Sequence, residues 1–134
     1  MKSFSKLSAL AAALLLCVSA FSQNKGYDVF IPIAKYFSQG NVESLSSWFA
    51  DNLDVSILST SGNSSRNQAK QILKSFFETY SPGHFEIVHT AGRANMKYAL
   101  GSLHSGGENF LVTIFVGRKD DTFRIQQLTI EKRQ

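Results

Sequence analysis

Hydrophobic residues recur at helical spacing in two neighbouring segments before residue 50. The segment YDVFIPIAKYFSQG (27–40) predicts a helix that ends at Gly40, because glycine commonly stops a helix. Pro32 fits the first turn of this helix if the helix begins near residue 31, and would otherwise kink it. Asn41 then caps a short second helix, on which one apolar stripe contains Val42, Leu45, Trp48 and Phe49.

The strongest helical signal follows a short alternating strand over 53–58 and a polar loop over 59–65. Ser65 and Gln68 form a capping box at the start of this third helix, and Pro82-Gly83 ends it. Its apolar face contains Ala69, Ile72, Leu73, Phe76, Phe77 and Tyr80.

Beyond residue 83 the pattern predicts strands only. Four apolar or alternating segments cover 84–91, 96–105, 108–118 and 122–132. The breaks between them, at 92–95, 106–107 and 119–121, have the composition of hairpin turns. These strands predict a meandering, mainly antiparallel sheet.

The stretch HSGG (104–107) raises the alternative of a catalytic histidine and serine. Its two glycines supply the positive φ angles that a two-residue hairpin turn requires. No acidic residue has a spacing that points to a triad, and the stretch lacks the strand-to-helix elbow of serine hydrolases. We therefore interpret it as a turn, in which Ser105 faces Glu108 and His104 faces Asn109.

This turn sets the register of the two strands around it. One face then places Ala99, Gly101 and Leu103 opposite Ile114, Val112 and Phe110. The other face carries Tyr98, Leu100 and Ser102 opposite Phe115, Thr113 and Leu111. Neither face is wholly polar, so we expect helices on one side of the sheet and partial cover on the other.

The alternation slips on the last strand, where the apolar positions change from odd to even numbers. A β-bulge near Gln126-Gln127 would return both halves to one face, and it would also bend the sheet. A bent sheet around helices predicts a hollow between them.

The N-terminal segment has the features of a secretory signal peptide. Two lysines precede an apolar run over 7–18 that is too short to span a bilayer comfortably. Ala20 and Ser22 favour cleavage after Ser22, which leaves a domain over 23–134 in the periplasm or outside the cell. Lipidation at Cys17 is disfavoured because Leu16, not a small residue, precedes the cysteine.

Cleavage changes both the charge and the cysteine content. The chain has 14 basic and 10 acidic residues, and two of the basic ones, Lys2 and Lys6, belong to the leader. The remaining basic residues form no long run, so the sequence does not predict nucleic-acid binding. Since the single cysteine also lies in the leader, no disulfide, thiol nucleophile or thiolate metal site is expected.

The order helix, helix, strand, helix and four strands resembles the cystatin-like cone of the nuclear-transport-factor-two superfamily. More closely, the chain resembles an uncharacterised domain-of-unknown-function family of small exported Bacteroidota proteins. The segments that carry this resemblance are GNVESLSSWFADNLDVSI, NQAKQILKSFFETYSPGHFEIVH, KYALGSL and IQQLTIEK. The resemblance implies an α+β cone with three helices on a bent sheet, and it supplies no activity. Superfamily enzymes such as ketosteroid isomerase place an Asp or His in the cone, but their motifs do not align here.

His89 is the one candidate for acid–base chemistry. It alternates with Phe85 and Ile87, and the register of the first hairpin places it opposite Tyr98. An imidazole beside a phenol can transfer protons. Because no carboxylate partner is evident, we prefer a structural histidine that is satisfied by a hydrogen bond.

The candidate ligand-binding residues are the aromatic side chains that would line the hollow. Such stripes are typical of a pocket wall, but more often of a packed core. The set contains Trp48, Phe76, Phe77, Tyr80, His89 and Tyr98. The three histidines lie on separate strands without ligand spacing, so neither a metal site nor a cofactor is expected.

Two functions remain open from the sequence. The first is a non-catalytic domain of the cell envelope that binds a small apolar ligand or a protein, with a homodimer through the second sheet face. The second is a small isomerase- or dehydratase-like enzyme that uses His89 as its acid–base group. An enzyme requires a polar group deep in an apolar cavity, whereas an interaction domain is compatible with a filled interior.

Overall fold

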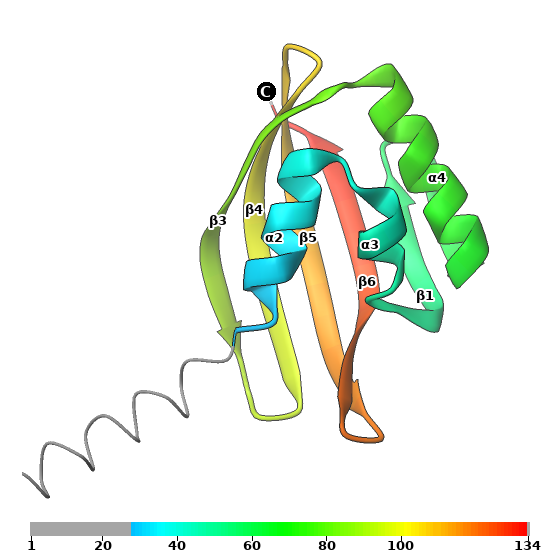
Figure 1. Ribbon diagram of the computed structural model, residues 1–134, viewed down its shortest axis with the longest axis vertical. Coiled ribbons are helices and arrows are strands. Elements are labelled where there is room, and N and C mark those ends of the chain that lie inside the picture. Colours follow the sequence, from blue (N-terminus) through cyan, green and yellow to red (C-terminus); the bar gives the residue numbers. More distant parts are fainter. Residues whose placement is uncertain (1–27, 134) are drawn as a thin grey trace, which may run out of the picture.

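Three helices cover one face of a six-stranded sheet in the computed structural model, which describes residues 28–133 (Figure 1). The helices are α2 (Phe30–Gln39), α3 (Val42–Ser46) and α4 (Arg66–Thr79). The strands are β1 (Phe49–Ile57), β2 (Thr60–Ser65), β3 (Pro82–Gly92), β4 (Met96–Ser105), β5 (Glu108–Lys119) and β6 (Thr122–Lys132). The sheet order is β2-β1-β6-β5-β4-β3, and only β1 and β6 pair in parallel among these strands. The predicted α+β class, with three helices against a mainly antiparallel sheet, is confirmed.

The predicted signal peptide over 1–22, its cleavage site and Cys17 lie outside the described residues. Within residues 28–133, no helix combines the length and the apolar character that crossing a membrane would require.

The first helix begins and ends where its sequence signals indicate. The Asp28 Oδ1 atom accepts a hydrogen bond from the Phe30 backbone N–H at 2.8 Å. Pro32 lies in the first turn, where its missing N–H costs no helical hydrogen bond. Gly40 follows the last turn with a φ of 64°, the left-handed conformation that glycine adopts readily.

The second helix is shorter than predicted. Asn41 caps it by accepting a hydrogen bond from the Ser44 N–H at 3.1 Å, as expected, but α3 ends at Ser46. Trp48 instead accepts a backbone hydrogen bond from Ile125, and the next residue already belongs to β1. Pairing with β6 therefore ends the helical stripe that the sequence predicted through Phe49.

The third helix forms as predicted. The Ser65 hydroxyl accepts a hydrogen bond from the Gln68 N–H at 3.1 Å, and the Gln68 side chain accepts one from the Ser65 N–H at 3.2 Å. This reciprocal capping box satisfies two backbone groups at the helix start. The buried residues of α4 are Ala69, Leu73, Phe76 and Phe77.

The polar segment 59–65, which the sequence predicted to be a loop, is mostly the edge strand β2. It pairs antiparallel with β1 through a two-residue turn at Leu58-Ser59. Most of its side chains are exposed and only Ser64 is buried, so the segment lacks the apolar alternation that marks a strand. The loop prediction was wrong because this strand is defined by backbone pairing at a solvated edge.

The β4–β5 hairpin has the predicted register. Ser105 pairs with Glu108 across Gly106-Gly107, whose φ angles are 57° and 78°. The predicted bulge on β6 is also confirmed, because the β5–β6 register shifts by one residue at Gln126. The shift lets Ile125, Leu128 and Ile130 all lie in the core.

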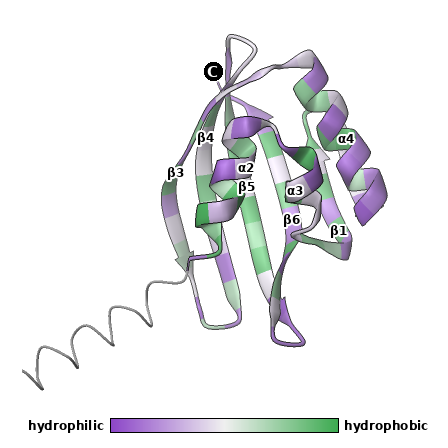
Figure 2. Cartoon of the chain, viewed as in Figure 1, coloured by the Kyte–Doolittle hydropathy of each residue, from purple (hydrophilic) through white to green (hydrophobic). Residues whose placement is uncertain are grey.

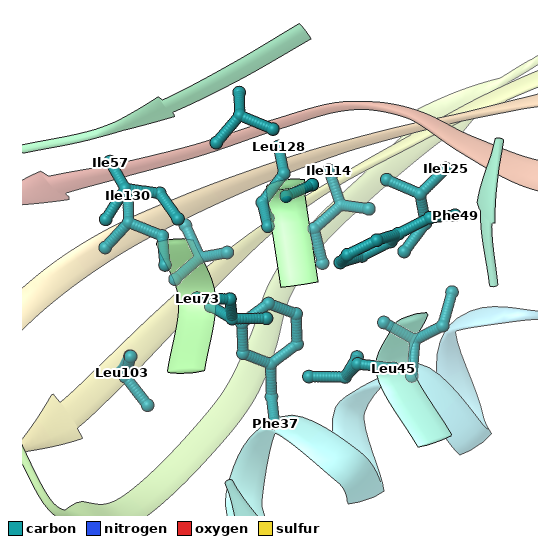
Figure 3. Close-up of a cluster of buried hydrophobic side chains, with 14 of the residues drawn as sticks. Phe37, Leu45, Phe49, Ile57, Leu73, Leu103, Ile114, Ile125, Leu128 and Ile130 are labelled. Atoms are coloured by element: carbon teal, nitrogen blue, oxygen red, sulfur yellow. The ribbon is translucent and has the colours of Figure 1, made fainter. Parts of the chain in front are cut away.

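The hydrophobic core lies between the three helices and the face of the sheet that they cover. Figure 3 shows side chains from the helices α2, α3 and α4 meeting side chains of the central strands, and Figure 2 shows hydrophilic residues on the outward surface of α4. The labelled residues are Phe37, Leu45, Phe49, Ile57, Leu73, Leu103, Ile114, Ile125, Leu128 and Ile130.

One glycine is explained by this packing. A methyl group added at Gly101 would lie 2.3 Å from the Phe85 Cζ atom. The Phe85 ring occupies that space and stacks on Phe37 with ring centroids 4.9 Å apart. The small-against-large face predicted for β4 and β5 is therefore completed by an aromatic ring from β3.

Candidate functional site

Aromatic rings fill the space where the sequence predicted a hollow. Phe76 and Phe77 of α4 are 4% and 8% exposed, and Tyr80 is half-buried against the same core. The Phe110 ring lies edge-on to Phe76 and Tyr80, with centroids 5.0 and 4.9 Å away. Phe37 closes the other side of the cluster against Phe77 at 6.3 Å. These predicted ligand-binding residues therefore occupy a packed interior.

Among the described residues, those that are fully buried in this interior include no titratable side chain. The buried polar residues of this set are Ser46, Ser64 and Ser105. The Ser105 hydroxyl donates to the Tyr80 carbonyl at 2.6 Å and lies 3.0 Å from the Ser81 carbonyl. This serine fastens the β4–β5 hairpin to the chain that leaves α4, and it has no partner that would make it a nucleophile.

His89 and Tyr98 lie on the opposite face of the sheet. The predicted pairing of these two residues was wrong, because the β3–β4 register shifts after Ile87 and places His89 opposite Leu100. The shift leaves Val88 unpaired and turns His89 away from the helices. The two rings remain diagonal neighbours, with centroids 6.1 Å apart. No sequence signal marks this bulge, because β3 is largely exposed on both sides.

His89 lies outside the interior in which the enzyme hypothesis placed it. The imidazole is exposed, and the ring beside it is the Tyr98 phenol. Within residues 28–133, no group of three His, Cys, Asp or Glu side chains is placed to hold a metal ion. His104 is also exposed, and its Nδ1 atom lies 2.9 Å from the Asn109 side-chain oxygen at the hairpin end.

Trp48 lies in the connection between α3 and β1, outside the aromatic cluster of the interior. It is half-buried and lines a surface hollow of about 680 Å³ together with Phe123 and Arg124. A neighbouring hollow of about 450 Å³ is lined by Arg66, Arg124 and Lys119. No sequence signal links these cations, because the pairing of β1 with β6 brings Arg66 beside the β5–β6 hairpin that carries Lys119 and Arg124.

The outer face of the sheet carries the second set of candidate residues. Its side chains on β4, β5 and β6 are half-buried, and all three helices lie on the other face (Figure 1). Tyr98 packs on Phe115 with ring centroids 5.2 Å apart. The outer-face set contains Tyr98, Leu100, Ser102, Leu111, Thr113, Phe115, Gln127 and Thr129.

Comparison with known proteins identifies similar chains but no activity. The family described as "Domain of unknown function (DUF4783)" matches residues 30–131. A DUF4783 protein from Bacteroides uniformis has a TM-score of 0.76 at 24% identity, over 80% of this chain and 99% of that chain. The corresponding values for a DUF4783 protein from Bacteroides fragilis are 0.74, 24%, 79% and 100%.

More distant structures share the fold alone. A cystatin-like domain of unknown function from Nostoc punctiforme has a TM-score of 0.62 at 12% identity, over 75% of this chain and 70% of that chain. The search of curated proteins gives no match.

Proposed function

The chain belongs to the DUF4783 family, and we propose that it is a non-catalytic interaction domain that works in the cell envelope after export. The observation that carries this proposal is the filled interior. Phe76, Phe77 and Phe110 occupy the space between α4 and the sheet, and the described core holds only serines as polar residues. Acid–base catalysis requires a titratable group beside the substrate, which the buried residues of this interior do not supply.

We propose that the outer sheet face is the interaction surface and that its occupant is a second copy of the chain. The outer-face set contains aromatic, aliphatic, hydroxyl and amide side chains and no charged one. In a two-fold dimer, each residue of this face meets a residue of the same face. The uncharged centre of this face avoids opposing like charges there, while Tyr98 and Phe115 provide the aromatic side chains that interfaces favour.

The rim of this face is polar, which is also typical of interfaces. Glu131 pairs with Leu111 near the end of β6, Asp54 of β1 pairs with Gln127, and Glu86 and His89 lie on the edge strand β3. The export part of the proposal rests on the signal peptide predicted over residues 1–22 and is independent of the sheet face.

Sedimentation velocity of the mature chain, with Thr113→Glu as the test variant, distinguishes the outcomes. Thr113 lies between Leu100 and Thr129 on the outer face. A dimer through this face would therefore bury a glutamate at position 113 without a partner of opposite charge, which is costly. We expect the parent to sediment as a dimer and Thr113→Glu as a folded monomer. Ile31→Glu is the matched control, because Ile31 is 66% exposed on α2, on the helix side of the sheet.

A parent chain that stays monomeric over the micromolar range would overturn the dimer. If the parent is a dimer but Thr113→Glu and Ile31→Glu sediment alike, the dimer interface lies on another surface. Circular dichroism of each variant confirms that a change in mass is not a change in folding.

A further inference from the structure

The backbone pairing between β1 and β6 is interrupted at one end of the sheet. Phe49 pairs with Ile125, but the next paired residues are Asp54 and Gln127. Residues 50–53 of β1 therefore face only Gln126 of β6, which is also the bulged residue against β5. The hollow of about 450 Å³ opens at this interruption, beside the β5–β6 hairpin.

Two arginines from distant segments line this hollow, and the short segment 47–51, which leads into β1, holds both of them. The Arg66 Nε atom donates to the Phe49 carbonyl at 3.1 Å, and its Nη2 atom donates to Asp51 at 3.0 Å. The Arg124 Nη1 atom donates to the Ser47 carbonyl. Each guanidinium has five N–H donors and so keeps donors for a ligand. Because backbone carbonyls already fix their positions, less side-chain entropy is lost when they bind an oxyanion.

The charge balance of the site leaves free cations. Asp51 is paired with Arg66, and the neighbouring Arg118 is paired with Asp121 at 3.0 Å. Lys119 and Arg124 also line the site, and neither forms an ion pair within residues 28–133. One further carboxylate, that of Asp120, lines the hollow and opposes the binding of an anion.

A flat apolar wall adjoins these cations. The hollow of about 680 Å³ shares Thr122 and Arg124 with the first hollow, and Trp48 and Phe123 line it. Both aromatic side chains are half-buried, so part of each remains open to a ligand. Indole and phenyl rings favour planar partners and also favour cations such as guanidinium beside them.

We propose that the two hollows form one binding site for an oxyanion, carboxylate or phosphate, that carries a flat aromatic group. The oxyanion lies among Arg66, Arg124 and Lys119, and the ring lies along Trp48 and Phe123. The site uses no residue of the outer-face set, so it is a second binding function beside the dimer face.

The single tryptophan of the chain makes this site directly observable. Titration with phenyl phosphate, followed by intrinsic fluorescence, should give a saturable change from Trp48. Benzoate in a parallel titration shows whether carboxylate or phosphate binds more tightly. Phenol, a neutral probe with the same ring, should bind much more weakly, and added NaCl should weaken phenyl phosphate binding because salt screens charge.

Three variants test the assignment of the charged groups. Arg124→Gln should raise the dissociation constant by about tenfold, because it removes the free guanidinium. Asp120→Asn should lower the dissociation constant by roughly threefold, because it removes a like charge from the lining. Asp120 has a φ of 51° in a hairpin turn, a conformation that asparagine tolerates, so this variant should fold normally. Lys74→Gln, on the exposed side of α4, is the control with an unchanged affinity.

A fluorescence response that never saturates with phenyl phosphate would overturn the site. Equal affinities of the parent and Arg124→Gln, with Asp120→Asn also unchanged, would do the same.

Discussion

Ser105 and His104 are sequence neighbours with opposite environments. His104 is exposed and contacts the Asn109 side chain at the end of the hairpin. Ser105 is fully buried, and its hydroxyl binds the Tyr80 carbonyl where α4 gives way to β3. The residue of HSGG that serves the fold is therefore the serine, through a hydrogen bond between segments far apart in the sequence.

Replacement of Ser105 by alanine should lower the free energy of unfolding by about 1–3 kcal/mol, because the Tyr80 carbonyl loses its side-chain donor. His104→Ala is the matched control and should cost less than about 0.5 kcal/mol, since it removes an exposed contact. Urea unfolding of the two variants beside the parent measures both values. A greater loss for His104→Ala would contradict this assignment and return attention to the imidazole.

At the scale of the element, the β1–β2 hairpin contains a strained residue. Leu58 has a φ of 56°, in the left-handed region that a leucine enters at a cost. Its backbone N–H donates to the Ile130 carbonyl at 3.0 Å, which ties the turn to β6. This hydrogen bond helps to hold the turn in place, although a leucine side chain is poorly suited to the left-handed conformation.

Leu58→Asn should raise the free energy of unfolding by about 0.5–1 kcal/mol, because asparagine tolerates the left-handed region better than leucine. Leu58→Ala is the control: it removes the same exposed leucine side chain but keeps a Cβ without a polar group that favours this conformation. Thermal unfolding followed by circular dichroism compares the two. Equal melting temperatures for Leu58→Asn and Leu58→Ala would show that no backbone strain is released.

Elements with local chemical signals could be predicted from the sequence. The capping box at Ser65 and the glycine pair at 106–107 each act within a few residues, and both form as expected. The β6 bulge was also predictable, because the change of apolar parity around Gln126 has to be absorbed somewhere. Most of the fold follows from these signals.

The features that could not be predicted from the sequence depend on pairing between distant segments. The exposed strand β3 tolerates either register, so nothing in its side chains reveals the shift that moves His89 to the outer face. Arg66 and Arg124 are 58 positions apart by their numbers, and they line one hollow because β1 lies beside β6. The candidate site was therefore less predictable than the fold that builds it.

At the scale of the whole molecule, the aromatic cluster determines what the interior can hold. Phe110 is fully buried and lies against both Phe76 and Tyr80. With these rings in place, the space between the helices and the sheet is a packed hydrophobic core.

Phe110→Ala should open a cavity that binds a small apolar molecule such as toluene. The substitution should cost about 3–5 kcal/mol of stability, and an apolar cavity of this kind stays dry and accepts such a ligand. We expect toluene to raise the melting temperature of Phe110→Ala but not that of the parent. Phe115→Ala, on the outer face, is the control that should gain no toluene response. Stabilisation of the parent by toluene would mean that its interior already contains space.

The strand order has a consequence for how the chain is made. The last strand, β6, lies between β1 and β5 and connects the β1–β2 hairpin to the rest of the sheet. During synthesis, β1 and β2 emerge first, and their next strand neighbour in the sheet, β6, follows only when residues 122–132 have left the ribosome. Contacts between segments far apart in the sequence, such as β1 and β6, are slow to form, because a long loop must close before they contribute. The six-stranded sheet is therefore completed only when residues 122–132 are available to join the β1–β2 hairpin to the β3–β5 meander.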